Sequence, residues 1–209
     1  CVGSRAIAGQ ITKEYLDTWS DGAGHTVGSL LRANGYDLDR WEEVQKKAKD
    51  IYAAVELHIE QGTNLEREGK TIGIVNGICA PTNMILTIHG EQSHSGGSSM
   101  ATRHDAFMAA AEIALALEKA AKCGTSAYTT GTVGYVEVKP NAENVVPGEV
   151  VMSIDIRDCE KESKDIVSGA FLDDVNYISR KRGVTVDIDE KCNDAPTLCD
   201  SHIKDLIAE

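Results

Sequence analysis

The first part of the chain contains one segment that is apolar almost throughout. Residues 51–59 read Ile-Tyr-Ala-Ala-Val-Glu-Leu-His-Ile, and the turn Gln61-Gly62 follows. A continuous apolar run of this length, closed by a turn, predicts a buried strand of an α/β sheet. Shorter elements are expected around it: helices at 11–19, 38–50 and 65–69, and a second strand at 71–78.

The pattern changes after Pro81, where alternating and helical segments follow one another in a regular order. Val150, Met152, Ile154 and Ile156 alternate with a second set of residues, which predicts a strand with one buried face. Strands are expected at 84–88, 132–138, 150–157 and 184–188, with long helices at about 99–122 and 161–182. The order β-α-β-β-α-β is that of the ferredoxin-like arrangement, an antiparallel sheet with both helices on one face.

These elements predict the α/β fold class and three stretches of chain. Residues 1–80 and 191–209 form parts of one α/β domain, which is interrupted at 81–190 by the inserted ferredoxin-like β-α-β-β-α-β domain. The chain starts at Cys1 without a methionine, and it stops within the amphipathic pattern of residues 201–209. We therefore expect a fragment of a longer protein.

The charge and cysteine content of the chain argue against some classes of binding partner and cellular compartment. The formal net charge is −12 and the sequence pI is about 4.9. Such an acidic surface repels phosphate backbones and anionic lipids, so neither nucleic acid nor a membrane is expected as a partner. The six cysteines are scattered without a CxxC pair, which favours free thiols in the cytoplasm over a disulfide framework. The sequence contains no apolar run long enough to span a membrane and no secretory leader.

Two histidines lie where a ligand could bind. His58 ends the predicted buried strand just before a glycine turn, an edge of α/β sheets where ligands bind, and a neutral imidazole there could hold a metal. A histidine satisfied within the core is the alternative for this residue. His94 lies in the loop Ser-His-Ser-Gly-Gly, whose small residues let a ligand approach the backbone. Local hydrogen bonding within the loop is the alternative for His94.

Two further polar residues come from the second half of the chain. Arg157 lies on the polar side of an otherwise apolar strand, where a guanidinium suits recognition of a carboxylate. A surface ion pair with Asp155 or Asp158 is the alternative. Asn144 precedes Val-Val-Pro, so its backbone is expected to be extended and its amide to reach a ligand, although turn chemistry also explains it.

Taken in order, these clusters resemble a known family. The motifs are His-Ile-Glu-Gln-Gly at 58–62, Gly-Glu-Gln-Ser-His-Ser-Gly-Gly-Ser-Ser-Met at 90–100 with Arg103 and Asp105 following, and Pro-Asn-Ala-Glu-Asn-Val-Val-Pro-Gly at 140–148 followed by Asp-Ile-Arg at 155–157. They resemble the N-carbamoyl-L-amino acid amidohydrolases, which stand with allantoate amidohydrolase and β-ureidopropionase in a dinuclear-metal amidohydrolase and peptidase superfamily. The resemblance runs from end to end of the chain.

The resemblance implies roles for these residues. His58 would be a metal ligand, and Gln61, His94, Asn144 and Arg157 would bind substrate, with Arg157 on its carboxylate and His94 also serving catalysis. The inserted domain would be a lid and dimerisation domain, so that a homodimer is implied. The reaction implied is hydrolysis of the ureido or amide C–N bond of an N-carbamoyl amino acid or an allantoate-type substrate, assisted by two divalent ions.

The resemblance is incomplete at both ends of the chain. The family's His-x-Asp motif, bridging Asp, Glu-Glu pair and late ligand His are expected outside residues 1–209. At most one metal ligand, His58, is therefore present, and the chain as given is expected to be inactive. Zinc, manganese and cobalt all suit such mixed ligands. A metallopeptidase or aminoacylase of the same superfamily stays open, as does a non-catalytic ligand-binding or dimerisation module.

Overall fold

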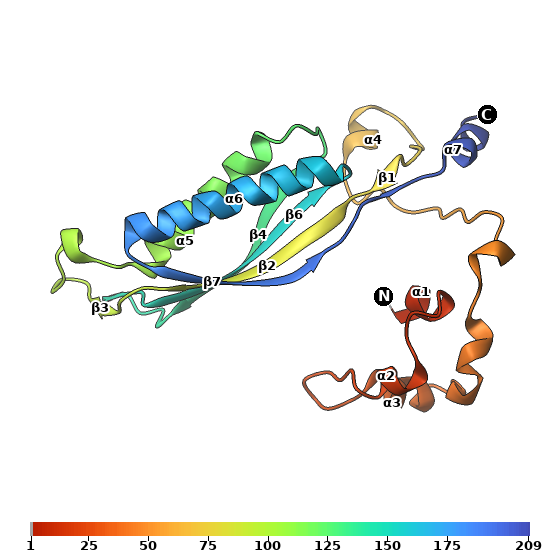
Figure 1. Cartoon of the computed structure of the whole chain (residues 1–209), viewed down its shortest axis with the longest axis horizontal. Coiled ribbons are helices and arrows are strands. Elements are labelled where there is room, and N and C mark those ends of the chain that lie inside the picture. The colour runs from red at the N-terminus through yellow and green to blue at the C-terminus, as the bar shows by residue number, and fades with distance from the viewer. Residues whose placement is uncertain (1) are drawn as a thin grey trace. The chain divides into compact units, whose positions relative to one another are not determined.

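The protein, described by a computed structural model over residues 2–209, divides into two compact units (Figure 1). One unit extends to Gly69, and the other comprises Lys70–Glu209.

The second unit is built on a four-stranded antiparallel sheet. Its strands are β2 (Ala80–His89), β4 (Thr130–Lys139), β6 (Glu149–Asp158) and β7 (Thr185–Asn193), in the spatial order β4-β6-β2-β7. Both long helices, α5 (Ala106–Lys122) and α6 (Lys161–Arg182), lie on one face of this sheet (Figure 1). The sequence order is β-α-β-β-α-β, so the expected ferredoxin-like domain and the α/β class are confirmed.

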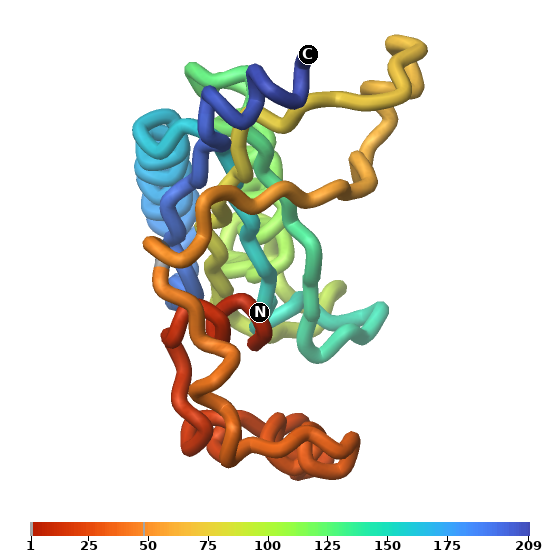
Figure 2. The backbone as a smooth tube through the Cα atoms, turned by 90° about the vertical axis from the view of Figure 1, so that its right-hand side faces the viewer, coloured from red at the N-terminus to blue at the C-terminus, as the bar shows by residue number. Residues whose placement is uncertain are grey.

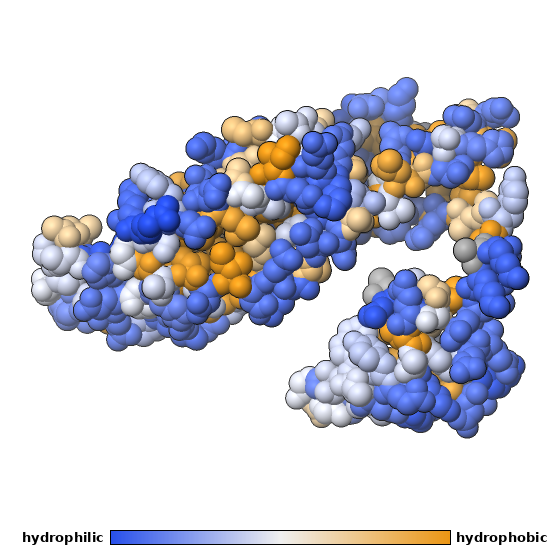
Figure 3. Space-filling model, in the orientation of Figure 1, coloured by the Kyte–Doolittle hydropathy of each residue, from blue (hydrophilic) through white to orange (hydrophobic). Residues whose placement is uncertain are grey.

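The core lies between the sheet and the two helices. Alternate residues of the two central strands, among them Leu86 and Met152, point into it and are almost fully buried. Phe171 of α6 and Ile113 of α5 pack against them. Burial of one such side chain contributes about 1.5–3 kcal/mol, so this layer supplies much of the stability of the unit. On the face that Figure 3 shows, the surface is largely hydrophilic, with smaller apolar areas.

The ends of the helices follow local capping rules. The Asp105 carboxylate accepts hydrogen bonds from the amides of Phe107 and Met108, so α5 begins at Ala106. The expected start near Ser99 is wrong, because Ser99 caps only the short 3₁₀ turn Met100–Thr102. Helix α6 has the expected bounds and ends at Gly183, whose φ of 65° is left-handed.

Two small ladders and one helix complete the second unit. Strand β1 (Gly77–Ile78) pairs with β8 (Thr197–Leu198), and β3 (Ser93–His94) pairs with β5 (Val145–Val146). The strand expected at 71–78 is thus limited to its last two residues. Helix α7 (Ser201–Ala208) ends the chain, with Asp200 as its N-cap.

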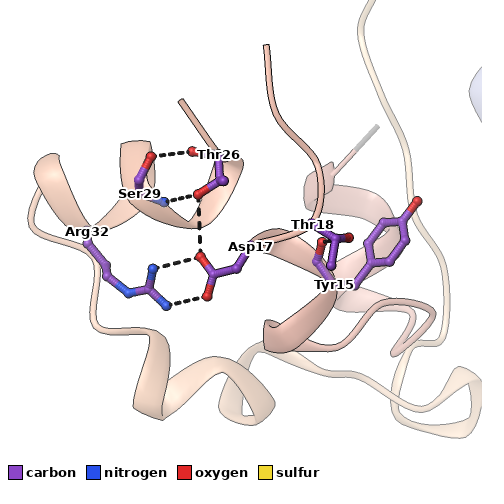
Figure 4. Close-up of polar contacts among 6 residues, drawn as sticks. All are labelled: Tyr15, Asp17, Thr18, Thr26, Ser29 and Arg32. Atoms are coloured by element: carbon purple, nitrogen blue, oxygen red, sulfur yellow. Dashed lines mark hydrogen bonds and ion pairs between the residues drawn. The ribbon is translucent and has the colours of Figure 1, made fainter. Parts of the chain in front are cut away.

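The first unit consists of short helices and extended segments. Its helical elements are α1 (Val2–Ile7), α2 (Lys13–Leu16), α3 (Val27–Ala33), the 3₁₀ helices η1 (Leu38–Val44) and η2 (Ala48–Asp50), and α4 (Asn64–Arg67). A small core of Ala6, Ile11, Leu16 and Leu38 joins them. Figure 4 shows that Arg32 forms two hydrogen bonds with the Asp17 carboxylate, at 2.8 and 2.9 Å, which link α3 to the end of α2. This guanidinium lowers the pKa of Asp17 below its usual value.

The buried strand expected at residues 51–59 is wrong. These residues are exposed, with Leu57 at 93% and Ile59 at 77%, and they pair with no strand among residues 2–209. The backbone runs as an extended stretch (Figure 2). An apolar run becomes a buried strand only when neighbouring strands satisfy its backbone and other side chains cover its faces. Among residues 2–209, no strand pairs with this segment and no side chains cover it.

The expectation of free thiols throughout is also wrong for one pair. Cys79, just before β2, and Cys159, just after β6, form a disulfide between the ends of two adjacent strands. Cys123, Cys192 and Cys199 are free. Within residues 2–209, no helix combines the length and the apolar character that crossing a membrane requires.

Candidate functional site

His94 and Asn144 lie together at one end of the second unit. His94 opposes Val145 in the β3–β5 ladder, and the Ser95 amide donates a hydrogen bond to the Asn144 carbonyl at 2.9 Å. His94 and Asn144 are both exposed to solvent. Two motifs 50 residues apart thus form one polar surface, which can present an imidazole and an amide to a ligand. We call the residues around it, 93–98 and 144–146, the loop site.

Main-chain groups and one arginine fix the loop that carries His94. The Gly96 amide donates to His94 Nδ1 at 3.1 Å. The His94 carbonyl accepts from the amides of Gly97 and Ser98. The half-buried Arg103 donates to the Ser98 carbonyl through Nε at 3.3 Å and also donates to the Ser95 carbonyl. The imidazole is therefore held by its own loop, and the alternative of local hydrogen bonding describes part of its environment.

Arg157 is exposed near the end of β6 and forms an ion pair. Its Nε and Nη2 atoms donate to the two carboxylate oxygens of Asp155, at 2.9 and 2.8 Å. This hydrogen bonding lowers the pKa of Asp155 and raises that of Arg157. The surface ion pair considered as the alternative is therefore present. Because Asp155 engages Nε and Nη2, Arg157 keeps its Nη1 group for an anionic ligand.

The structure does not bring Arg157 to the loop site of the same chain. Strand β6 begins at Glu149, beside the end of β2 that leads into β3, whereas Arg157 opposes Pro81 at the other end of β2. Arg157 lies eight residues further along the strand than Glu149, which corresponds to about 26 Å at about 3.3 Å per residue. A small substrate cannot span that length.

His58 and Gln61 lie in the first unit, on the exposed segment after residue 57. His58 Nδ1 is 2.6 Å from the Ile59 carbonyl oxygen, so Nδ1 carries the proton and Nε2 keeps its lone pair. Glu60 caps α4, because its carboxylate accepts from the amides of Asn64 and Leu65 at 2.8 and 3.1 Å. Gln61 has a left-handed φ of 57°, which turns the chain. The motif at 58–62 thus combines a free imidazole nitrogen with a helix cap.

A metal site is not complete within the described part of the chain. Residues 2–209 contain no group of three or more His, Cys, Asp or Glu side chains placed to hold an ion. The Nδ1 hydrogen bond of His58 to a carbonyl is the arrangement that orients metal-binding histidines. His58 therefore fits one ligand position, and two ions need several more.

A hollow of about 310 Å³ lies elsewhere in the first unit. Its cations are paired: Lys13 with Asp39 at 3.0 Å, and Arg32 with Asp17. None of the expected site residues lines it. It has no free positive group that would favour a carboxylate substrate.

The sequence motifs included Arg103 but assigned it no role. The residue follows the loop motif in sequence, and nothing in its spacing shows that its guanidinium returns to the carbonyls of Ser95 and Ser98. An arginine next to a loop rich in serine and glycine was the available signal.

Comparisons with known proteins agree with this fold. Residues 81–182 match the peptidase dimerisation domain family. The chain is 36% identical to an N-carbamoyl-L-amino acid amidohydrolase of Geobacillus stearothermophilus, over 97% of this chain and 49% of the relative. It is 35% identical to a ureidoglycolate hydrolase of Arabidopsis thaliana, over 100% of this chain and 45% of the relative.

A solved structure gives the same result. An amidase of the hydantoinase/carbamoylase family from Burkholderia multivorans superposes with a TM-score of 0.87 at 29% identity, covering 99% of this chain and 49% of the amidase. The class is therefore the α/β proteins that carry a peptidase dimerisation domain. Within that class, the resemblance to the N-carbamoyl-L-amino acid amidohydrolase family is confirmed. The chain spans about half the length of the curated relatives it matches.

Proposed function

We propose that this chain is the lid and part of the catalytic domain of a metal-dependent hydrolase. The enzyme cleaves the ureido or amide C–N bond of a small substrate that also carries a carboxylate. The observation that carries the proposal is the loop site, where His94 and Asn144, distant in sequence, are joined by a backbone hydrogen bond. Relatives named for N-carbamoyl amino acids and for ureidoglycolate support the substrate class.

Each residue has a task in this proposal. Arg157 binds the substrate carboxylate with its remaining N–H groups, while Asp155 holds the guanidinium in place. His94 and Asn144 donate hydrogen bonds to the ureido or amide group, where charge develops during the reaction. Gln61 contacts substrate from the turn after His58. In this proposal the residue ranges 1–80 and 191–209 belong to the catalytic domain, and 81–190 to the lid.

Two divalent ions, zinc, manganese or cobalt, complete the proposal. When bound, they supply an activated water and polarise the scissile carbonyl. His58 would hold one of them through Nε2, which the Nδ1 hydrogen bond leaves unprotonated. The other ligands are expected from parts of the longer protein that this chain does not include.

We propose a homodimer in which the two copies share their sites. About 26 Å of strand, at about 3.3 Å per residue, lies between Arg157 and Glu149, which is at the end of β6 nearer the loop site of the same copy. If both contact one substrate, they come from two copies, and a two-fold dimer creates two such shared sites. The match to a dimerisation domain supports this arrangement. We propose the cytoplasm as the compartment, on the basis of the free Cys123, Cys192 and Cys199.

The direct test measures ureido hydrolysis by the metal-loaded full-length protein. The substrates are an N-carbamoyl amino acid, allantoate and 3-ureidopropionate. Turnover of one of them should fall roughly 100-fold in Arg157→Ala, because a charge-assisted pair is lost. Arg180→Gln, at an exposed position of α6, is the control that keeps full activity. Absence of turnover on all three, with metal bound, would reject the ureido substrate class and favour the peptidase or binding-module alternatives.

Mixing two inactive variants tests the shared site. His94→Ala and Arg157→Ala are purified separately, then mixed and allowed to exchange subunits. A mixed dimer holds one site with both residues intact if the site is shared. Random pairing should then restore about a quarter of the wild-type rate. If each copy uses its own His94 and Arg157, mixing restores nothing.

A further inference from the structure

One peptide group connects Arg103 to the ring of His94. Arg103 Nη2 donates to the Ser95 carbonyl, and the Gly96 amide, in the same peptide group, donates to His94 Nδ1 at 3.1 Å. A trans peptide is planar, and its C=O and N–H bonds point in opposite directions. A guanidinium bound to the carbonyl side therefore fixes the direction of the N–H on the other side.

The hydrogen bond from Gly96 determines the tautomer of His94. A backbone N–H can only donate, so Nδ1 must accept, and the neutral ring carries its proton on Nε2. The Nδ1 side faces the loop, which leaves Nε2–H available to a ligand. Arg103 also polarises the shared peptide, and this strengthens the Gly96 N–H as a donor.

We infer that Arg103 is a positioning residue that keeps the neutral ring of His94 in the Nε2–H tautomer, ready to donate a hydrogen bond to substrate. Arg103 is suited to this task because it is half-buried and holds two carbonyls at once, those of Ser95 and Ser98. A lysine carries the same charge but cannot present a planar fork to both carbonyls. The consequence for turnover rests on the proposed function, whereas the tautomer does not.

The tautomer is measured on this chain with ¹⁵N-labelled histidine. Ring ¹⁵N shifts and two-bond couplings at pH about 8.5, where an ordinary imidazole is neutral, distinguish the two nitrogens. His94→Gln identifies the His94 signals. The wild-type ring should be at least about 90% Nε2–H, and Arg103→Gln should reduce this to a mixture of both tautomers. Gly96→Ala keeps the N–H, its added Cβ comes no nearer than 3.5 Å to the His94 ring, and it should match the wild type.

Two results overturn the inference. One is a wild-type ring protonated on Nδ1, which needs no variant and does not depend on how any variant folds. The other is an unchanged tautomer ratio in Arg103→Gln. A folded Arg103→Lys should give an intermediate ratio.

Kinetics of the full-length enzyme provide a second readout. A donor that acts mainly in the transition state affects kcat more than KM, so Arg103→Gln should lower kcat roughly 10- to 100-fold with KM changed less than about threefold. A change confined to KM would contradict the positioning role. If the proposed function is wrong, the wild-type enzyme will not hydrolyse the ureido substrates, but the tautomer measured by NMR will be unchanged.

Discussion

The backbone amide of Ser95 donates a hydrogen bond to the backbone carbonyl of Asn144 at 2.9 Å. This bond extends the short β3–β5 ladder and holds two polar motifs in register. Because it uses main-chain atoms, the Asn144 side chain is not needed to join the loops.

The first prediction separates the structural role of the Asn144 main chain from the substrate contact proposed for its side chain. Asn144→Ala keeps the main-chain bond, so the free energy of unfolding should change by less than about 0.5 kcal/mol. Hydrolysis by the full-length enzyme should nevertheless fall roughly 10- to 100-fold, because an amide that contacts substrate is lost. Chemical denaturation and steady-state kinetics measure the two effects. A large loss of stability would instead make the side chain a structural element of the turn.

Lys164 of α6 is fully buried, and its side chain contacts the start of β2 and the residue that follows β7. Its Nζ donates to the Asp194 carbonyl and lies 3.5 Å from the Pro81 carbonyl. Lys164→Ala should lower the free energy of unfolding by about 3 kcal/mol, since it leaves a cavity and an unsatisfied carbonyl. Lys164→Met fills the space and should cost less. Exposed Lys161, paired with Asp165 on the same helix, is the control: Lys161→Met should change stability by less than about 0.5 kcal/mol.

Glu112 of α5 predicts a pH dependence of stability. Its carboxylate accepts hydrogen bonds from Lys181 and Arg182 of α6, and both lower its pKa from the ordinary 4.5. A lowered folded-state pKa means that the contribution is fully present above pH 4.5 and is lost as the pH falls through the folded-state value. Glu112→Gln should therefore destabilise the protein at pH 7 by roughly 0.5 kcal/mol, with the difference disappearing in acid.

Urea denaturation of wild type and Glu112→Gln across this pH range is the measurement. Glu118→Gln is the control, because Glu118 pairs within α5 with exposed Lys122. Its effect at pH 7 should be smaller. A Glu112→Gln deficit that grows as the pH falls would contradict the assigned direction of the pKa shift.

Alanine substitution of two glycines, one within α6 and one at its end, should change the free energy of unfolding in opposite directions. Gly183 ends α6 with a φ of 65°, and an added Cβ would lie 2.3 Å from His104 Nδ1. Gly183→Ala should thus lower the unfolding free energy by at least about 1 kcal/mol. Gly169 lies within α6, and an added Cβ there would meet nothing within 4 Å, so Gly169→Ala should raise the unfolding free energy by about 0.5–1 kcal/mol. Thermal unfolding of both variants compares them, and equal shifts would contradict the backbone argument.

The sequence predicted the ferredoxin-like domain well because its elements depend on local patterns. Alternation at Val150–Ile156 and the helical stripe through Phe171 are both read within one element, and the structure buries those residues. Helix α5 was misplaced at its start because two capping residues, Ser99 and Asp105, compete, and only the backbone shows which one caps the long helix.

The sequence named the candidate site residues but not their arrangement. The motifs named His94, Asn144 and Arg157, but their spacing contained nothing about which of them meet. The ladder that joins His94 to Asn144 and the length of β6 that separates Arg157 from them are relations between elements. The role of Arg103 was not predicted for the same reason, because its guanidinium binds carbonyls and leaves no periodic signal.

By itself, the sequence determined the order of strands and helices, the family resemblance and the residue types available for chemistry. These follow from periodicity and motif, which are properties of neighbouring residues. Only the tertiary structure decided that residues 51–59 lack a sheet partner, that Cys79 meets Cys159, and that one peptide connects Arg103 to His94. The physical reason is that strand pairing, burial and hydrogen bonding between distant residues depend on what the rest of the chain places beside them.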